Sequence, residues 1–282
     1  MTRHIDVWKP AVVGLLVLPV LAGGCTTNPA TGERDMVLIS EGQEIAMGNE
    51  AAPQFEKEFG GKVANASLQS YVQGIGQRIA AVCDRPMQYD YTLVASKVPN
   101  AFALPGGKIF VTAGLMARMT NERQLAAVLG HETAHVCALH NVKGMQNQMG
   151  ASVLVEVAAR IAGGGDTTRS VGKIVGAMAT LKYGRNYEYQ ADKFGIKYMD
   201  RAGYNPHGMV ELLTVLLNLS EEGSSLGEMF ASHPLSSKRI EEAKAIIAEN
   251  HPAANPSAPD PGAGRFRQMR SRLLAAVPNA LN

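Results

Sequence analysis

His131-Glu132-Thr133-Ala134-His135 is the most informative stretch of this sequence. On a helix, residues four apart share one face, so both imidazoles can reach one zinc ion while Glu132 holds a water. Seven histidines and 25 acidic residues among 282 give about 0.015 expected chance matches to this motif. Nothing between residues 121 and 140 breaks a helix, and Leu125, Val128 and Leu129 give it an apolar face. The stretch therefore predicts a zinc-binding helix, the alternative being a solvated helix that is merely rich in histidine.

A catalytic zinc ion needs a third protein ligand and an open position for water. Glu188, which follows His135 by 53 residues, is the candidate third ligand. Asp192 comes four residues later on the same helical face, where it can accept a hydrogen bond from a ligand imidazole or an arginine. A Glu-Asp pair at this spacing is ordinarily a solvated face, so the metal role depends on the first motif. On a continuous helix Cys137 and His140 would lie about 200° and about 180° around from the two histidines, so both are expected to be structural.

The segments around this helix predict an α+β fold: a mostly helical, zincin-like domain with a small sheet beside the zinc helix. Alternating apolar residues indicate a strand over residues 89–96, and Pro105-Gly106-Gly107 is expected to connect a hairpin. Ser40 begins a capping pattern for a helix that Pro53 is expected to break. The other predicted elements are helices at 41–59 and 67–82, hairpin strands at 101–104 and 108–112, and helices through most of 113–249.

Composition narrows the class of protein. Apolar residues make up 46% and charged residues 18% of the chain, which excludes a disordered chain and a polytopic membrane protein. The apolar stretch 151–162 contains Glu156 and Arg160 and is therefore expected to be a buried helix rather than a membrane span. A net charge of +2 excludes a nucleic-acid binder that relies on bulk charge. Cys83 and Cys137 could pair in an oxidising compartment, but two buried free thiols are favoured.

Residues 1–24 are expected to be a lipoprotein signal peptide. A basic start precedes an apolar run that is too short to span a bilayer. The run ends in Leu21-Ala22-Gly23-Gly24-Cys25, which resembles the bacterial lipobox, so Cys25 is expected to be acylated. By the same resemblance, Thr26 in place of Asp favours the outer membrane. The expected location is the bacterial cell envelope, as an outer-membrane lipoprotein that faces the periplasm.

The rest of the chain divides into three predicted parts. Residues 25–39 are expected to be a tether, and residues 40–250 a zinc metallopeptidase domain. Residues 251–282 would form a flexible linker and a short basic helix. This helix has apolar residues on one face and four arginines, so it could either touch anionic lipid or pack on the domain.

Together these residues resemble the gluzincin metallopeptidase family that includes HtpX and the CAAX prenyl proteases. The resemblance covers about residues 31–248 and is strongest to the soluble, periplasmic lipoprotein branch, because the transmembrane helices of HtpX are missing. Four landmarks carry it: Asn100-Ala101-Phe102-Ala103 with Gly106-Gly107 after it, His131-Glu132-x-x-His135, Glu188-x-x-Ala191-Asp192, and Ser232-His233-Pro234 followed by Arg239-Ile240.

The resemblance implies one zinc ion per chain, held by His131, His135 and Glu188, with Glu132 as the general base. It also implies that residues 100–104 are an edge strand that pairs with an extended substrate, through Asn100, Ala101, Phe102 and Ala103. An unpaired edge can indeed bind any extended peptide through its main chain. The alternative is a plain structural hairpin.

The sequence suggests one role for Arg239 and leaves three roles open for His233. Arg239 could pair with Asp192 and so fix its helix against the zinc site. By the resemblance, His233 is either a fourth zinc ligand that must leave before substrate binds, which we term a plug, or a donor to the reaction's oxyanion. A purely structural His-Pro turn is the third possibility.

The function expected from these features is a zinc-dependent metalloendopeptidase that cleaves misfolded or misassembled envelope proteins. Its expected partners are those substrates, the membrane through the lipid anchor, and the outer-membrane assembly machinery, with no nucleic acid. Two other classes stay open: a chaperone-like envelope lipoprotein with little proteolytic activity, and a zinc hydrolase of small molecules or an exopeptidase. An intact Glu132 argues against a vestigial site, which has no use for the base.

Overall fold

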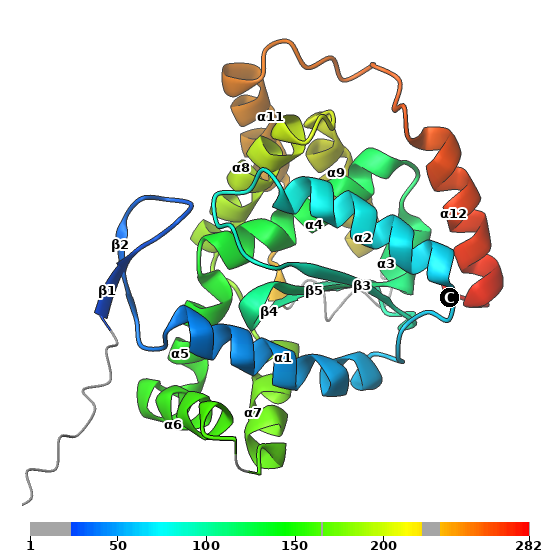
Figure 1. Cartoon of the computed structure of the whole chain (residues 1–282). Coiled ribbons are helices and arrows are strands. Elements are labelled where there is room, and N and C mark those ends of the chain that lie inside the picture. The colour runs from blue at the N-terminus through cyan, green and yellow to red at the C-terminus, as the bar shows by residue number, and fades with distance from the viewer. Residues whose placement is uncertain (1–23, 165, 222–231, 282) are drawn as a thin grey trace, which may run out of the picture.

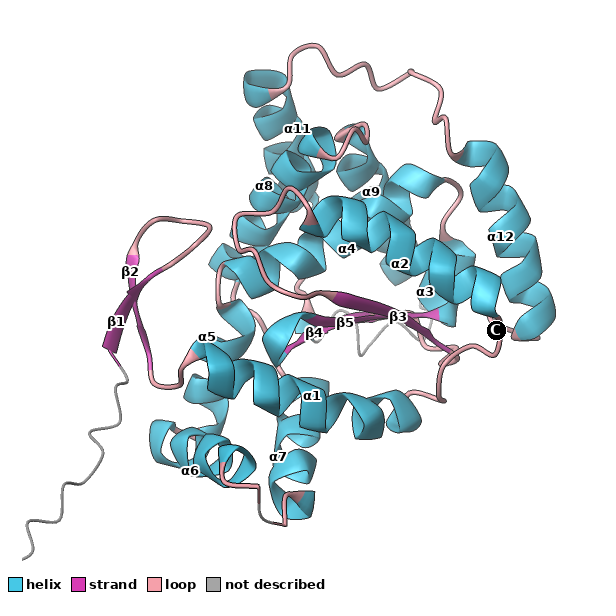
Figure 2. Cartoon of the chain, viewed as in Figure 1, coloured by secondary structure: helices cyan, strands magenta, loops and turns pink. Residues whose placement is uncertain are grey.

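The computed structural model describes residues 24–164, 166–221 and 232–281 (Figure 1). Residues 1–23 of the expected signal peptide lie outside the described residues. Helices surround a small central sheet (Figure 2), as the predicted α+β class requires. The helices are α1 (Glu41–Glu58), α2 (Ala66–Ala80), α3 (Ala113–Arg118), α4 (Glu122–Cys137), α5 (His140–Met149), α6 (Ala151–Ala162), α7 (Thr168–Ala179), α8 (Arg185–Arg201), α9 (His207–Glu221), α11 (Ser237–Asn250) and α12 (Ala263–Ala276).

The central sheet has three strands in the order β3 (Asp90–Val94), β5 (Lys108–Thr112), β4 (Ala101–Leu104). The strands β4 and β5 form the predicted antiparallel hairpin, whereas β3 runs parallel to β5. The short helix η1 (Pro105–Gly107) connects the hairpin, and both of its glycines have positive φ, 70° and 75°. A side chain on Gly106 would come within 2.7 Å of the α1 backbone, so only glycine allows this close approach.

The two faces of the sheet carry different helices (Figure 1). On one face α2 and α4 pack on the strands, and α8 and α9 pack in turn on α4. On the other face lies α1, which α6 and α7 cover. Each side has its own apolar cluster, so α4 is enclosed within the larger of the two.

The first helix corrects one prediction. Ser40 forms the expected capping box with Gln43, but α1 continues through Pro53 instead of breaking there. A proline inside a helix costs about 3 kcal/mol. Phe55 and Met47 are fully buried on either side of it, and each contributes about 1.5–3 kcal/mol. Burial of this apolar stripe therefore offsets the proline, which lies on the exposed side of the helix.

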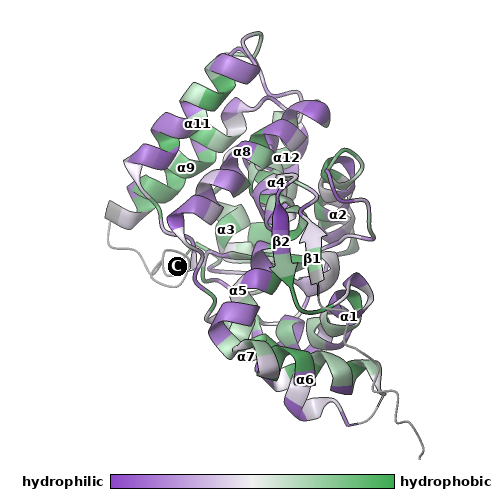
Figure 3. Cartoon of the chain, turned by 90° about the vertical axis from the view of Figure 1, so that its left-hand side faces the viewer, coloured by the Kyte–Doolittle hydropathy of each residue, from purple (hydrophilic) through white to green (hydrophobic). Residues whose placement is uncertain are grey.

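The N-terminal segment is ordered where the sequence predicts a tether. The strands β1 (Gly24–Thr27) and β2 (Arg34–Val37) pair antiparallel. The Asn28 side chain between them donates to the Ala138 carbonyl at 2.8 Å, and Asp35 pairs with Lys143 at 2.9 Å. These contacts fix the hairpin beside the end of α4, on the side that Figure 3 turns to the viewer.

The C-terminal segment is also fixed to the domain, contrary to the predicted flexible linker. Asp260 accepts hydrogen bonds from the backbone N–H groups of Glu122 and Arg123, at 2.8 and 3.3 Å, and so caps the start of α4. Phe266 and Leu273 of α12 are fully buried. Of the two alternatives for this helix, packing on the domain is therefore the one observed.

The expectation of a buried α6 holds for one face only: Leu154, Val157, Ala158 and Ile161 pack in the cluster around α1, whereas Glu156 and Arg160 are exposed. Among the described residues, none of the helices combines the length and the hydrophobicity that crossing a bilayer requires. All three cysteines are free.

Candidate metal centre

The helix α4 presents its histidines from within the core. Asn121 caps it by accepting a hydrogen bond from the Gln124 N–H at 3.0 Å. From Gln124 to Cys137 every residue of the helix is buried, because α2, α8 and α9 all pack on it. The two motif histidines are thus held rigidly and out of solvent.

Four side chains converge at one point, and we term them the donor cluster: His131, His135, Glu188 and His233. All four are buried, and their nitrogen and oxygen atoms lie within 4.8 Å of one another. The two imidazole Nε2 atoms are 3.1 Å apart, and they lie 3.5 and 3.4 Å from the two oxygens of Glu188. The Nδ1 atom of His233 is 3.1 Å from Glu188 Oε1.

This donor cluster fits zinc. Ligand atoms that are about 2.0–2.1 Å from a tetrahedral zinc ion lie roughly 3.3–3.4 Å from one another, close to the separations above. Imidazole nitrogen and carboxylate oxygen are also ligands that zinc commonly takes in proteins. The structure thus brings together the three predicted ligands and adds His233 as a fourth donor.

Asp192 and Arg239 form hydrogen bonds that fix side chains of the donor cluster. Asp192 Oδ1 is 3.0 Å from His131 Nδ1, so the other ring nitrogen of His131 faces the cluster. Arg239 donates to both oxygens of Asp192 at 2.7 Å and to Glu188 Oε2 at 2.6 Å. Burial opposes its charge, but Asp192 and Glu188 raise the pKa of Arg239. The arginine therefore stays charged and fixes α11 against α8, through the pairing with Asp192 that the sequence suggested.

His140 lies next to the donor cluster, although the helical-angle argument places it on the far side. That argument assumed one continuous helix, whereas α4 ends at Cys137 and Leu139 adopts a left-handed conformation with φ 59°. The turn brings His140 Nδ1 to 3.0 Å from His135 Nδ1, while its Nε2 lies 3.0 Å from Gln190 Oε1. Cys137 does point away, toward the Tyr89 hydroxyl at 3.4 Å.

These contacts decide which nitrogen of His135 carries the proton. Burial lowers the pKa of His140 to about 4, so the ring is neutral. Its Nε2–H donates to Gln190, which leaves Nδ1 to accept from the Nδ1–H of His135. The Nε2 lone pair of His135 is then free to bind a metal. Sequence reasoning missed this role of His140.

Glu132 stands beside the donor cluster without belonging to it. Its side chain is buried, and among the described residues its Oε2 has no hydrogen-bond partner. Its other oxygen lies 3.8 Å from His233 Nε2. Burial raises the pKa of Glu132, which makes it a better proton acceptor. The carboxylate is thus available to a molecule that enters the site.

Comparison with known proteins now identifies the family, since the model of peptidase family M48 matches residues 66–247. This chain belongs to peptidase family M48. The beta-barrel assembly-enhancing protease of Escherichia coli (strain K12) is 27% identical over 278 residues, which are 94% of this chain and 55% of that protein. The metalloprotease LoiP of Escherichia coli (strain K12) is 34% identical over 155 residues, 54% of this chain and 60% of LoiP.

A mitochondrial relative extends the comparison. The metalloendopeptidase OMA1 of Schizosaccharomyces pombe is 29% identical over 226 residues, 78% of this chain and 66% of OMA1. The chain spans about half the length of the beta-barrel assembly-enhancing proteases that it matches. The resemblance drawn from the four sequence landmarks is confirmed.

A groove of about 580 Å³ touches β4 in this M48 domain. Phe102 of β4, Phe59, and the end of α7 with the loop that follows it line this groove. Ser232, which precedes His233, also lines it. The groove is therefore next in sequence to one member of the donor cluster.

The backbone groups of β4 alternate between its partner strand β5 and the opposite side, and all four residues of the strand are buried. The Asn100 carbonyl accepts from the Thr112 N–H of β5 at 3.0 Å. In an antiparallel pair, alternate residues bond to the same neighbour, so the backbone groups of Ala101 and Ala103 face away from β5. The Asn100 side chain accepts from the Ala101 N–H at 2.8 Å. The predicted strand is therefore at an edge of the sheet, and its substrate role stays a proposal.

Tyr183 is a residue of this site that no sequence pattern marked. Its ring stacks on His135, with centroids 4.0 Å apart and planes at 25°, and lies 5.1 Å from the His233 ring. Its N–H donates to the Ser232 carbonyl at 2.9 Å. Its hydroxyl is buried and, within the described residues, has no hydrogen-bond partner. A single tyrosine in a loop has no periodicity that could have identified it.

Proposed function

We propose that this protein is a zinc-dependent metalloendopeptidase. The observation that carries the proposal is the donor cluster itself, whose separations fit one tetrahedral zinc ion, with the unpartnered carboxylate of Glu132 beside it. Membership in peptidase family M48 supports the same chemistry.

The ligands would be His131, His135 and Glu188. Zinc bound there would supply a Lewis acid that polarises the scissile carbonyl and acidifies the attacking water. Glu132 accepts the proton of that water and returns it to the leaving amine as general base and then acid. Asp192 and Arg239 keep the ligands in position throughout.

His233 we assign as a plug. Its place within the donor cluster supports this role, because a fourth protein ligand fills the position that an attacking water needs. The imidazole must then move aside before substrate is cleaved, which would keep the free protein inactive.

The substrate we propose is an extended segment of an unfolded protein. Such a segment can bond to the outward backbone groups of Ala101 and Ala103 and so lie in the groove beside β4. Folded proteins have few free extended segments, so this mode of binding selects misfolded or misassembled chains. Their identity as envelope proteins is suggested by the relative named a beta-barrel assembly-enhancing protease, and through it we propose contact with the outer-membrane assembly machinery.

The proposed location is the outer membrane, with the domain in the periplasm. Cys25 is exposed on β1, as an acylated residue must be. The change Cys25→Ser should release the protein from membranes into the soluble periplasmic fraction. A variant that still sediments with membranes would show a different attachment.

Digestion of casein and of an unfolded outer-membrane protein tests the activity. The wild-type protein should cleave both, lose cleavage with a chelator, and regain it with zinc. The alternative, a chaperone-like lipoprotein, predicts that the protein prevents aggregation of the same substrates without cleaving them and that a chelator changes nothing. Release of single terminal residues alone would instead show an exopeptidase.

A further inference from the structure

We propose that Tyr183 is a catalytic residue whose hydroxyl donates a hydrogen bond to the oxyanion that develops on the scissile carbonyl. This inference rests on the proposed peptidase function. It assigns a role that His233 cannot fill while it stays among the metal ligands, namely the donor that works together with the metal on the oxyanion.

The position of Tyr183 is tightly fixed. The residue lies two positions before α8, which carries Glu188, and its N–H donates to the carbonyl of Ser232, next to His233. Its ring stacks flat on His135 and is tilted toward His233. Tyr183 therefore touches two members of the donor cluster and is anchored to the segments that carry the other ligands.

The Tyr183 ring lies against two rings of the donor cluster. His135 uses Nδ1 to contact His140 and presents Nε2 to the donor cluster. The Tyr183 ring contacts His135 and His233, the residues that converge on the cluster. The ring therefore borders the point where the four donors meet.

The hydroxyl is what requires an explanation. Phenylalanine would provide the same stacking surface, yet this side chain is 5% exposed and buries a polar group that has no partner among the described residues. Such a group destabilises the folded protein unless something binds it. A tyrosine hydroxyl is protonated at neutral pH, so the group is a hydrogen-bond donor. An arriving oxyanion is the partner that it lacks.

Tyr204 provides a matched control. Its side chain is also buried, at 8% exposure, and its hydroxyl is likewise without a partner in the described part of the chain. It faces Arg78, 4.7 Å from the ring centroid, and belongs to no part of the donor cluster. The changes Tyr183→Phe and Tyr204→Phe therefore remove the same kind of group from two different places.

The test compares the two variants with wild type, each loaded with zinc to the same content. Tyr183→Phe should lower kcat by about 10²-fold and leave KM nearly unchanged, because the bond forms only in the transition state. It should weaken binding of a phosphinic peptide, which mimics the tetrahedral oxyanion, by a similar factor in calorimetry. Tyr204→Phe should change neither quantity.

A third measurement separates this role from a structural one. In the metal-free proteins both variants should keep or raise the unfolding midpoint, since each removes an unsatisfied buried hydroxyl. If Tyr183→Phe keeps wild-type kcat and phosphinic peptide affinity, the ring acts by stacking alone and the inference is wrong. If wild type itself cleaves no peptide when loaded with zinc, the proposed function fails, and the inference fails with it.

Discussion

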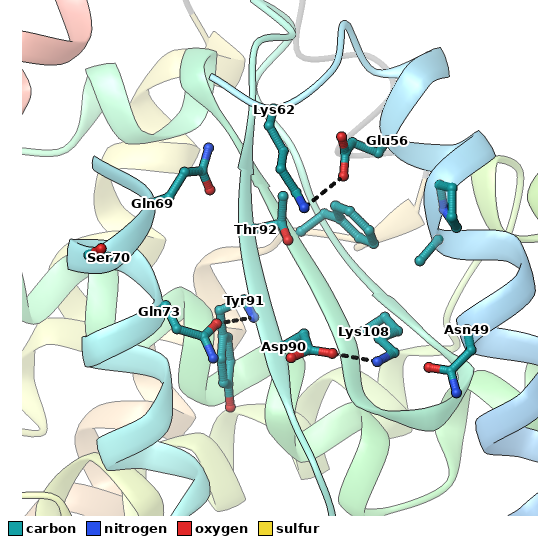
Figure 4. A pocket seen from close by; sticks show the side chains of 13 residues that line it. Asn49, Glu56, Lys62, Gln69, Ser70, Gln73, Asp90, Tyr91, Thr92 and Lys108 are labelled. Carbon is teal, nitrogen blue, oxygen red and sulfur yellow. Dashed lines mark hydrogen bonds and ion pairs between the residues drawn. The ribbon is translucent and has the colours of Figure 1, made fainter. Parts of the chain in front are cut away.

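The two edge strands of the central sheet differ in what lies beside them. The β4 edge has no further strand beside it among the described residues, and its Phe102 lines a groove that Ser232, the neighbour of His233, also lines. The β3 edge is covered by α2, whose glutamines bond to the strand as another strand would. Figure 4 shows this bond between Gln73 and Tyr91. Gln69 bonds to both the N–H and the C=O of Leu93, Gln73 accepts from the Tyr91 N–H, and Gln77 donates to the Tyr89 carbonyl.

The geometry of a helix beside a strand explains this cover. Four residues of helix rise about 6.0 Å, and two residues of strand rise about 6.6 Å. Glutamines at successive i, i+4 positions therefore stay opposite alternate residues of β3 over three contacts. Unpaired edges invite pairing with other extended chains. The comparison teaches that side chains of the domain itself close the β3 edge, whereas the proposed function requires a substrate chain to pair at the β4 edge.

A pocket larger than this groove does not change the conclusion. It measures about 770 Å³ and lies at the β3 edge between α1 and α2 (Figure 4). Its charged side chains already pair with one another, Lys62 with Glu56 and Lys108 with Asp90. Size alone would therefore select the wrong site.

The largest expected effect comes from removing the base beside the β4 edge. Glu132→Gln should lower kcat by about 10²–10⁴-fold, because proton transfer is lost while the zinc ligands remain. The variant should keep its zinc content and still bind a labelled unfolded peptide, measured by fluorescence anisotropy. Glu156→Gln, on the exposed face of α6, is the control. Near-normal cleavage by zinc-loaded Glu132→Gln would end the proposed mechanism.

The sequence alone predicts those features of the fold and of the site that depend on the local spacing of residues. The zinc helix, the hairpin and the Glu188 and Asp192 pair all follow from periodic patterns within one element. Patterns of this kind are preserved because residues four apart on a helix always share a face. The strand order, which makes β4 an edge, was not readable from such patterns.

What the sequence could not supply depends on contacts between distant segments. The helix α4 ends at Cys137, and the left-handed turn at Leu139 has no glycine or proline to mark it, so the approach of His140 to His135 was missed. Asn28 holds the N-terminal hairpin through a carbonyl 110 residues away, and Asp260 caps α4 from 138 residues away. Single polar residues in loops have no period, and only the folded chain reveals their partners.

A second prediction tests the β4 edge from the side of the substrate. A cleavable peptide that is N-methylated at alternate residues loses the N–H groups that would bond to Ala101 and Ala103. Loss of one or two such bonds should raise KM by about tenfold. The same peptide methylated at the intervening residues is the control, since those N–H groups face away from the strand. Equal KM values for the two series would contradict pairing at this edge.

A third prediction concerns the fourth ligand position of the metal, which His233 would fill. If His233 is a plug, His233→Ala should raise basal proteolysis several-fold at unchanged zinc content, because the fourth position is opened. His207→Ala, at the start of α9 and outside the donor cluster, should have no effect. A strong loss of turnover in zinc-loaded His233→Ala would instead assign His233 as the oxyanion donor. Unchanged activity would leave it a structural turn.

The smallest effects are expected at the closed edge, where two similar substitutions should behave differently. Gln73 acts as an acceptor, taking the Tyr91 N–H at 2.7 Å, whereas Gln77 acts as a donor to the Tyr89 carbonyl, also at 2.7 Å. A carboxylate can accept but not donate. Gln73→Glu should therefore keep the unfolding midpoint close to wild type. Gln77→Glu places a carboxylate against a carbonyl oxygen and should cost about 1 kcal/mol, or roughly 2–4 °C in Tm.

Neither change should alter kcat, because both lie at the edge away from the donor cluster. Equal losses of stability at the two positions would show that the glutamines cover β3 by packing alone and that the edge is not closed by hydrogen bonds.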